Sequence, residues 1–151
     1  MSKTKVLFLC TGNTARSQMA EAFLRAYGDD HFDAFSAGLE PHDINPLTTR
    51  VMAERGFDMA GQRPKGLNEF LGMVHFGYLI TVCQRAQEKC PIFPGVSHRL
   101  AWPFEDPAQA EGTEEERLEA FRRVRDAIDE RVRYWLEEEL HLPLKTSSPP
   151  G

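Results

Sequence analysis

A cysteine and an arginine flank a short, glycine-containing loop near the N-terminus of this chain. Four apolar residues at positions 6–9 lead into Cys10, and five residues separate Cys10 from Arg16. A pattern typical of a helix begins beyond Ser17. This order predicts a buried strand, a loop and a helix N-terminus, a combination whose backbone N–H groups and helix dipole attract an anion. The segment therefore constrains the fold to a strand–loop–helix unit with a built-in anion site.

The residue types in this loop predict nucleophilic chemistry on an oxyanion. We expect the loop to lower the pKa of Cys10, which would make it a thiolate near neutral pH. Arg16 can donate two parallel hydrogen bonds to a tetrahedral oxyanion, and no carboxylate occurs from position 10 to position 20 to oppose it. Gly12 permits close approach of the backbone, and Ser17 can bond the thiolate or cap the helix. The alternative is that Cys10 is a small buried apolar residue at a strand end.

Apolar runs and helical patterns alternate along the chain. Runs at 5–9, 32–38, 76–82 and 98–102 predict strands, and the segments after the loop, at 45–56, at 67–71 and from Thr113 onward predict helices. Thr113 and Glu116 predict a capping box at the start of the last helix. Such alternation predicts an α/β fold, a single domain with a four-stranded parallel sheet flanked by helices. Cys10 and Cys83 both end predicted strands, so we expect them at the same edge of the sheet, where ligands bind.

Length and charge limit the possible functions. The chain has 151 residues and a net charge of −5, which fits one domain and makes nucleic-acid binding unlikely as a function. Residues 1–140 form the predicted domain, and the proline-rich residues 141–151 are expected to be a flexible tail. Because no apolar run has the length of a membrane span or signal peptide, we expect a cytoplasmic protein with no membrane partner and reduced thiols.

Two further cysteines, Cys83 and Cys90, are seven positions apart. The polar segment at 84–89, followed by prolines, predicts a loop. If the segment were helical, the two Cα atoms would be about 10.5 Å apart, whereas a disulfide needs less than about 7 Å. The segment is therefore either irregular or has to unwind for a disulfide to form. Two unrelated thiols are the simpler alternative, and zinc binding is disfavoured because the spacing is not Cys-x2-Cys.

Residues 10–17, Cys-Thr-Gly-Asn-Thr-Ala-Arg-Ser, resemble the active-site loop of low-molecular-weight protein tyrosine phosphatases. They resemble more closely the loop of the thioredoxin-coupled arsenate reductases that share this fold, and the resemblance extends from position 5 to about 135. It implies that Cys10 is the nucleophile and that Cys83 and Cys90 are a redox pair. It also implies that the oxyanion is bound by residues of the loop, namely Thr11, Gly12, Asn13, Thr14, Ala15, Arg16 and Ser17.

The resemblance implies reduction of arsenate to arsenite through a covalent Cys10–arsenic adduct. Cys83 would then attack Cys10, and Cys90 would attack Cys83, leaving a Cys83–Cys90 disulfide. Thioredoxin is the implied reductant, with mycothiol or glutaredoxin as alternatives. No metal or organic cofactor is implied for the chemistry, phosphate or sulfate would mimic the substrate, and a monomer is expected.

Asp106, followed by Pro107, matches the general-acid aspartate of the family. A departing oxygen is a poor leaving group unless it is protonated, and a carboxylic acid above the loop can supply the proton. Glu105 is the local alternative, but it lacks the following proline. An aromatic residue usually follows this pair in the tyrosine phosphatases, whereas Ala108 follows here, which argues against phosphotyrosine as the main substrate.

The chain departs from the family pattern at two positions. Many relatives have a cysteine where this chain has Ala15, and the implied relay does not need that thiol. Some reductases bind potassium near the loop, and Asn13, Glu21 and Ser36 match three of its ligands. Lys65 lies where a fourth, acidic ligand is expected, so a potassium site is doubtful and the lysine could supply the positive charge itself.

Two other functions remain open at this stage. A low-molecular-weight phosphatase would hydrolyse phosphoesters through a phosphocysteine and would lose little on replacement of Cys83 or Cys90. An oxyanion or redox sensor on the same fold would bind an anion without multiple turnovers. An arsenate reductase, by contrast, would lose turnover when either cysteine is replaced.

Overall fold

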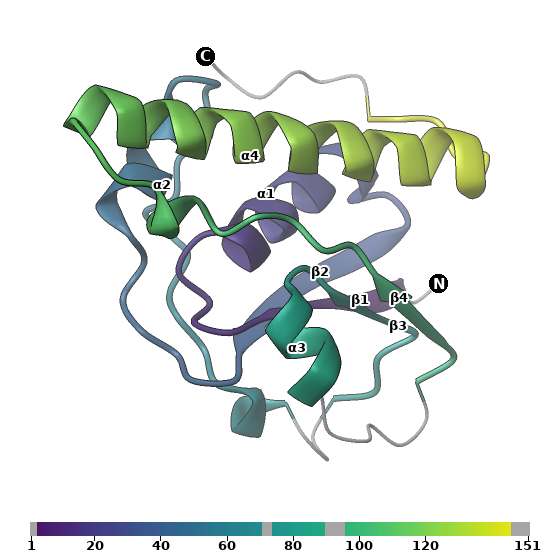
Figure 1. Cartoon of the computed structure of the whole chain (residues 1–151). Coiled ribbons are helices and arrows are strands. Elements are labelled where there is room, and N and C mark those ends of the chain that lie inside the picture. The colour runs from purple at the N-terminus through teal and green to yellow at the C-terminus, as the bar shows by residue number, and fades with distance from the viewer. Residues whose placement is uncertain (1–2, 71–73, 90–95, 146–151) are drawn as a thin grey trace.

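The computed structural model describes residues 3–70, 74–89 and 96–145. Its centre is a four-stranded parallel sheet with the strand order β2-β1-β3-β4 (Figure 1). The strands are β1 (Thr4–Cys10), β2 (Phe32–Gly38), β3 (Tyr78–Thr81) and β4 (His98–Ala101). This sheet confirms the predicted α/β class and the predicted number and direction of strands.

In the described residues, four α-helices accompany the sheet: α1 (Arg16–Gly28), α2 (Pro46–Ala53), α3 (Gln84–Lys89) and α4 (Glu114–Tyr134). A π-helical turn, Trp135–Glu139, extends α4, and short 3-10 turns occur at Leu67–Glu69 and Pro107–Gln109. In Figure 1, α1 lies between the sheet and the long α4, and α3 lies away from α4 near the ends of the strands.

The apolar periodicity of the sequence accounts for the core. Residues 6–9 of β1 are fully buried, as expected for a central parallel strand covered on both faces. The apolar stripe of α4 is also buried, as expected for a helix face that packs on the core; it comprises Leu118, Phe121, Val124, Ile128 and Val132. At the start of α4, Thr113 and Glu116 form the predicted capping box.

The structure corrects the prediction of a loop at 84–89, because these residues form α3. The segment Gln-Arg-Ala-Gln-Glu-Lys contains strong helix formers throughout, and its polarity reflects exposure to solvent. The predicted third strand at 76–82 is shorter, as Tyr78–Thr81. The predicted short helix at 67–71 is a 3-10 turn at Leu67–Glu69.

The C-terminal boundary of the domain, placed at residue 140 from the sequence, stays a prediction. Within 141–145, the backbone N–H of Leu142 donates to the carbonyl of Leu136, and that of Lys145 donates to the carbonyl of Tyr27. The rest of the predicted tail, 146–151, lies outside the described residues. No helix in the described part of the chain is long and apolar enough to cross a membrane.

Replacing Phe121 by Ala tests the role of α4 in the core. Phe121 is fully buried, so the variant should lose about 3–5 kcal/mol of unfolding free energy. Chemical denaturation monitored by circular dichroism measures this loss. Arg117→Ala, an exposed position on the same helix, is the matched control and should change stability by less than about 0.5 kcal/mol. Equal effects of the two substitutions would contradict the assignment.

Candidate functional site

The loop between β1 and α1 is held in shape by the segment that follows β2. Four backbone N–H groups of that segment donate to four carbonyls of the loop at N–O distances of 2.8–3.1 Å. The donor–acceptor pairs are Leu39 to Cys10, Glu40 to Thr11, His42 to Gly12 and Asn45 to Thr14. In a trans peptide the N–H of the next residue points away from such a carbonyl. The N–H groups of residues 11–13 and 15 therefore face the opposite side, where the Cys10 thiol lies.

The Cys10 sulfur is surrounded by hydrogen-bond donors. The backbone N–H of Asn13 donates to Cys10 Sγ at 3.1 Å, and Ser17 Oγ lies 2.8 Å from the same sulfur. Because Asn13 Nδ2 donates to Ser17 Oγ at 2.7 Å, the serine oxygen already accepts a bond, and its own proton can point to the sulfur. Asn13 adopts a positive φ of 55°, a conformation that asparagine tolerates well.

The pKa of Cys10 is raised, whereas the sequence predicts that it is lowered. Burial removes the thiol from water and raises its pKa above the ordinary value. Hydrogen bonds from Ser17 and Asn13 and the charge of Arg16 act in the lowering direction, without reversing the effect of burial. The sequence located the donors but not the degree of burial, so the prediction of a lowered pKa was wrong for the thiol in this structure.

Arg16 connects the loop to the predicted acid. Its side chain is only 12% exposed, donates to the Phe104 carbonyl at 3.0 Å and lies 3.7 Å from Asp106 Oδ2. The structure thus brings Arg16 and Asp106 together beside the loop. An arginine in this position can turn its remaining donors towards an oxyanion in the loop.

The neighbouring Glu105 is engaged elsewhere. Its carboxylate accepts two hydrogen bonds from Arg123 on α4, whereas Asp106 is extended at φ −85° and ψ 109° and caps the turn Pro107–Gln109. Pro107 restricts the residue before it to such an extended conformation. The geometry therefore favours Asp106 over Glu105 as the carboxyl group facing the loop.

Cys83 lies beside the same loop. Its thiol is free and buried, and its sulfur is 3.4 Å from the Thr11 hydroxyl. The backbone N–H of Ala86 in α3 also donates to this sulfur at 3.4 Å. The predicted meeting of Cys10 and Cys83 at one edge of the sheet is confirmed through their shared neighbour Thr11, whereas Cys90 lies outside the described residues.

A buried polar layer behind the loop was not predicted as a unit. Asn13 Oδ1 accepts hydrogen bonds from Gln18 Nε2 and from the backbone N–H of Lys65, both at 2.8 Å. Gln62 Nε2 in turn donates to Gln18 Oε1 at 2.6 Å. The glutamine at position 18, directly after the loop, was a possible signal because it lies on the buried side of a helix. Nothing in the sequence marks Gln62.

Gly38 is a second residue that sequence reasoning missed. A Cβ atom at this position would lie 2.8 Å from the backbone N of Asn13 and 2.9 Å from the Thr11 carbonyl oxygen. The glycine therefore allows the end of β2 to approach the loop closely. The only signal in the sequence was a glycine at a strand end, which usually marks a turn.

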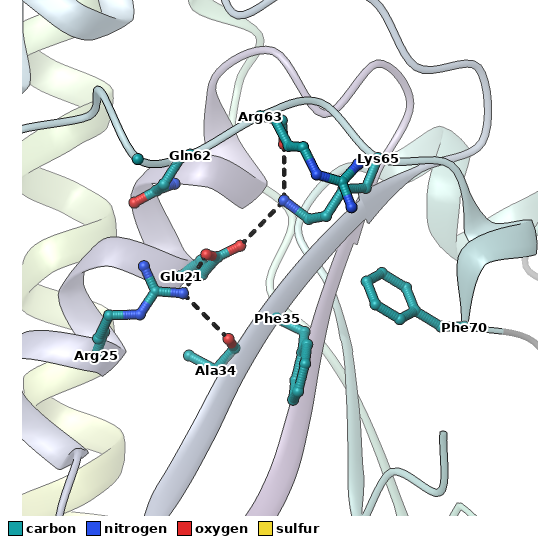
Figure 2. A pocket seen from close by; sticks show the side chains of 9 residues that line it. Glu21, Arg25, Ala34, Phe35, Gln62, Arg63, Lys65 and Phe70 are labelled. Carbon is teal, nitrogen blue, oxygen red and sulfur yellow. Dashed lines mark hydrogen bonds and ion pairs between the residues drawn. The ribbon is translucent and has the colours of Figure 1, made fainter. Parts of the chain in front are cut away.

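The residues considered for potassium do not offer a free set of ligands. Ser36 Oγ donates to Glu21 Oε1, and Lys65 Nζ lies 3.5 Å from the same oxygen (Figure 2). An ammonium group beside this carboxylate repels a second cation. In the described part of the chain, no group of three or more His, Cys, Asp or Glu residues could hold a metal ion. Because Lys65 already places a positive charge beside Glu21, these residues do not fit a bound potassium ion.

Comparisons with known proteins define the class to which this chain belongs. A model of the low molecular weight phosphotyrosine protein phosphatase family matches residues 5–143. The chain is therefore a member of that family.

Relatives within this family narrow the comparison. An arsenate reductase of Halalkalibacterium halodurans is 42% identical over 137 residues, which are 91% of this chain and 98% of the relative. A solved arsenate reductase in a phosphate-binding state superposes with a TM-score of 0.73 at 32% identity, covering 86% of this chain and 94% of that one. A thioredoxin-dependent arsenate reductase of Corynebacterium glutamicum gives a TM-score of 0.67 at 29% identity, over 92% of this chain and 63% of that one.

Ser17→Ala should raise the pKa of Cys10 further, because it removes a hydrogen bond that lowers this pKa. The midpoint of the pH profile for iodoacetamide alkylation should move to higher pH. At a fixed pH below the midpoint, alkylation should slow by up to about tenfold, since one pKa unit is a tenfold change in thiolate. Ser97→Ala, at an exposed serine, is the control. A downward shift would contradict the assigned hydrogen bond.

Gly38→Ala should disturb the loop without entering it. The added methyl group meets backbone atoms that cannot move independently, so we expect a loss of about 2 kcal/mol in stability and weaker phosphate binding. Protection of Cys10 from alkylation measures that binding. Gly61→Ala, where no atom lies within 4 Å of the added carbon, is the matched control. Unchanged phosphate binding in Gly38→Ala would refute the close-approach argument.

Proposed function

We propose that this chain reduces arsenate to arsenite through a relay of three thiols. The observation that carries this proposal is the position of Cys83, whose sulfur lies 3.4 Å from the Thr11 hydroxyl, at the loop that holds Cys10. A phosphatase needs only the first of these thiols, so the second one beside the loop is an argument for redox chemistry. The arsenate reductases among the relatives support the same conclusion.

Substrate binding would use the whole loop, residues 11–17. The inward-facing N–H groups and Arg16 bind the arsenate oxygens, and Ser17 donates to the sulfur of Cys10. Because burial raises the pKa of Cys10, the thiol proton has to leave as the substrate binds. Arsenate as a dianion is a base and can take up this proton, which leaves a thiolate next to a monoanion.

In the first chemical step the Cys10 thiolate forms a bond to arsenic and one arsenic–oxygen bond breaks. Asp106 donates a proton to the leaving oxygen, which departs as water. Arg16, which belongs to the loop and lies 3.7 Å from Asp106 Oδ2, keeps the acid close to the oxyanion. The product of this step is a covalent Cys10–arsenic(V) adduct.

In the second step the Cys83 thiolate attacks the Cys10 sulfur. A Cys10–Cys83 disulfide forms, the sulfur–arsenic bond breaks, and its electron pair reduces arsenic(V) to arsenite. Cys90 then attacks Cys83, which releases the Cys10 thiolate and leaves a Cys83–Cys90 disulfide. An external dithiol returns this disulfide to two thiols. Thioredoxin is the proposed donor, on the strength of the thioredoxin-dependent relative.

The attack of Cys90 on Cys83 requires α3 to change conformation, because a helix would hold positions 83 and 90 about 10.5 Å apart. The described side chains of α3 are weakly anchored: only Ala86, a methyl group, is buried. The ion pair between Arg85 and Glu40 is exposed, and such pairs contribute roughly 0–1 kcal/mol. Unwinding of this short helix therefore costs little.

The experiment that tests the proposal is arsenate-dependent NADPH consumption in the presence of thioredoxin and thioredoxin reductase. The intact chain should turn over many times, whereas Cys83→Ser and Cys90→Ser should complete at most one turnover. Hydrolysis of p-nitrophenyl phosphate, which needs Cys10 but neither Cys83 nor Cys90, should persist in both variants. That second assay shows that the variants still fold and bind an oxyanion.

The alternative function is that of a phosphoester phosphatase, which the same loop and the same acid support. It predicts hydrolysis of phenyl phosphates by the intact chain and no consumption of NADPH with arsenate. That combination of results would reject the reductase proposal in favour of the phosphatase.

A further inference from the structure

Glu21 is a buried carboxylate that neither binds the oxyanion nor takes part in the thiol relay. Its side chain is 5% exposed and contacts three groups, the Ser36 hydroxyl, Arg25 and Lys65. A buried charge is costly unless other charges and hydrogen bonds compensate it. Of the two cations, Arg25 is 51% exposed, whereas Lys65 is 11% exposed. The lysine is thus the cation least screened by solvent.

Lys65 also contacts the loop through its backbone. Its N–H donates to Asn13 Oδ1 at 2.8 Å, and its carbonyl accepts from the N–H of Gly38, also at 2.8 Å. Asn13 is the residue whose own N–H reaches the Cys10 sulfur. Lys65 therefore contacts Glu21 through its ammonium group and the loop of the oxyanion site through its backbone.

We propose that Lys65 is a positioning residue of the oxyanion site, whose ammonium group cancels the charge of Glu21 behind the loop. Without the ammonium group, the buried Glu21 carboxylate would be left with Arg25 alone, whose half-exposed side chain is screened by solvent. Its negative charge would then be less well compensated on the far side of the loop that has to bind a dianion. This proposal deepens the proposed function, because it concerns the same loop. It applies to any tetrahedral oxyanion and can be tested with phosphate alone.

A cavity of about 270 Å³ opens beside the ion pair (Figure 2). Residues from α1, β2 and the segment 61–65 line it, among them Glu21, Arg25, Phe35 and Lys65. Lys65 Nζ also donates to the Arg63 carbonyl at 2.8 Å, so the ammonium group is held on two sides. The cavity gives small solutes access to the place where this group lies, which makes chemical rescue of a truncated lysine feasible.

The principal test is Lys65→Ala with phosphate affinity as the readout, measured by protection of Cys10 from alkylation. The variant should bind phosphate about tenfold more weakly, which corresponds to about 1.4 kcal/mol. Propylammonium replaces the atoms removed from the lysine and should restore most of the affinity, whereas 1-propanol, of the same size but neutral, should not. Rescue by 1-propanol as well would mean that only filled volume matters, and it would overturn the proposal.

A double-mutant cycle separates the charge of Lys65 from its packing. Glu21→Gln combined with Lys65→Ala removes both charges and should return phosphate affinity to within about twofold of the intact chain. An affinity as weak as that of Lys65→Ala alone would overturn the proposal. If Lys65→Ala fails to fold, Glu21→Gln alone decides: the uncompensated lysine should strengthen phosphate binding several-fold, and unchanged binding would refute the role.

Steady-state kinetics distinguish this proposal from the proposed function. In the arsenate assay, Lys65→Ala should raise KM about tenfold and change kcat by less than about twofold, because the reacting groups are intact. Lys3→Ala, which removes a half-buried lysine paired with Asp29, is the matched control. If the intact chain does not reduce arsenate, the proposed function is rejected. The phosphate-affinity experiments would still test the role of Lys65. Normal phosphate affinity in Lys65→Ala rejects the role of Lys65 alone.

Discussion

The site depends on a row of backbone hydrogen bonds between the segment after β2 and the carbonyls of the Cys10 loop. These bonds turn four carbonyls away from the thiol, and planar peptide groups then turn the N–H groups towards it. An anion site made in this way needs no particular side chain at most loop positions. It needs instead a segment close enough to bond the loop from behind, which is why β2 ends in Gly38.

Segments that are distant in the sequence thus hold the Cys10 loop in its conformation. Residues 39–45 orient the loop from one side, Lys65 and Gln62 hold Asn13 and Gln18 from another, and Asp106 approaches Arg16 from a third. The parallel sheet brings these segments to one edge, because residues 39–45 follow β2 and Asp106 follows β4. The segment 62–65 follows α2 instead and is joined to this edge by the bridge between Gly66 and Gly38. The same geometry places Cys83 beside the loop, although 72 positions separate it from Thr11, the loop residue that it contacts.

The sequence predicted the features that depend on local pattern and topology. It identified the loop from Cys10 to Ser17, the four parallel strands, the capping box at Thr113 and the convergence of Cys10 and Cys83 at one edge. It failed where the outcome depends on three-dimensional burial. The pKa of Cys10 is raised because the thiol is enclosed, and α3 was mistaken for a loop because a solvated helix has no apolar stripe. The role of Gln62 could not be predicted from local pattern, because its hydrogen-bond partner Gln18 is 44 residues away in the sequence.

The position of β2 at the edge of the sheet has a consequence for how the site is lost. β2 pairs along its length with β1 alone, and a single bridge between Gly38 and Gly66 is its other backbone pairing within the described chain. An edge strand opens locally at a lower free energy than the core unfolds. Detachment of its end would release the loop carbonyls while β1, α1 and α4 stay folded. Exchange of the amide protons of Gly38 and Glu40 should then report the lifetime of the competent loop, and on heating the activity should be lost before the helical structure.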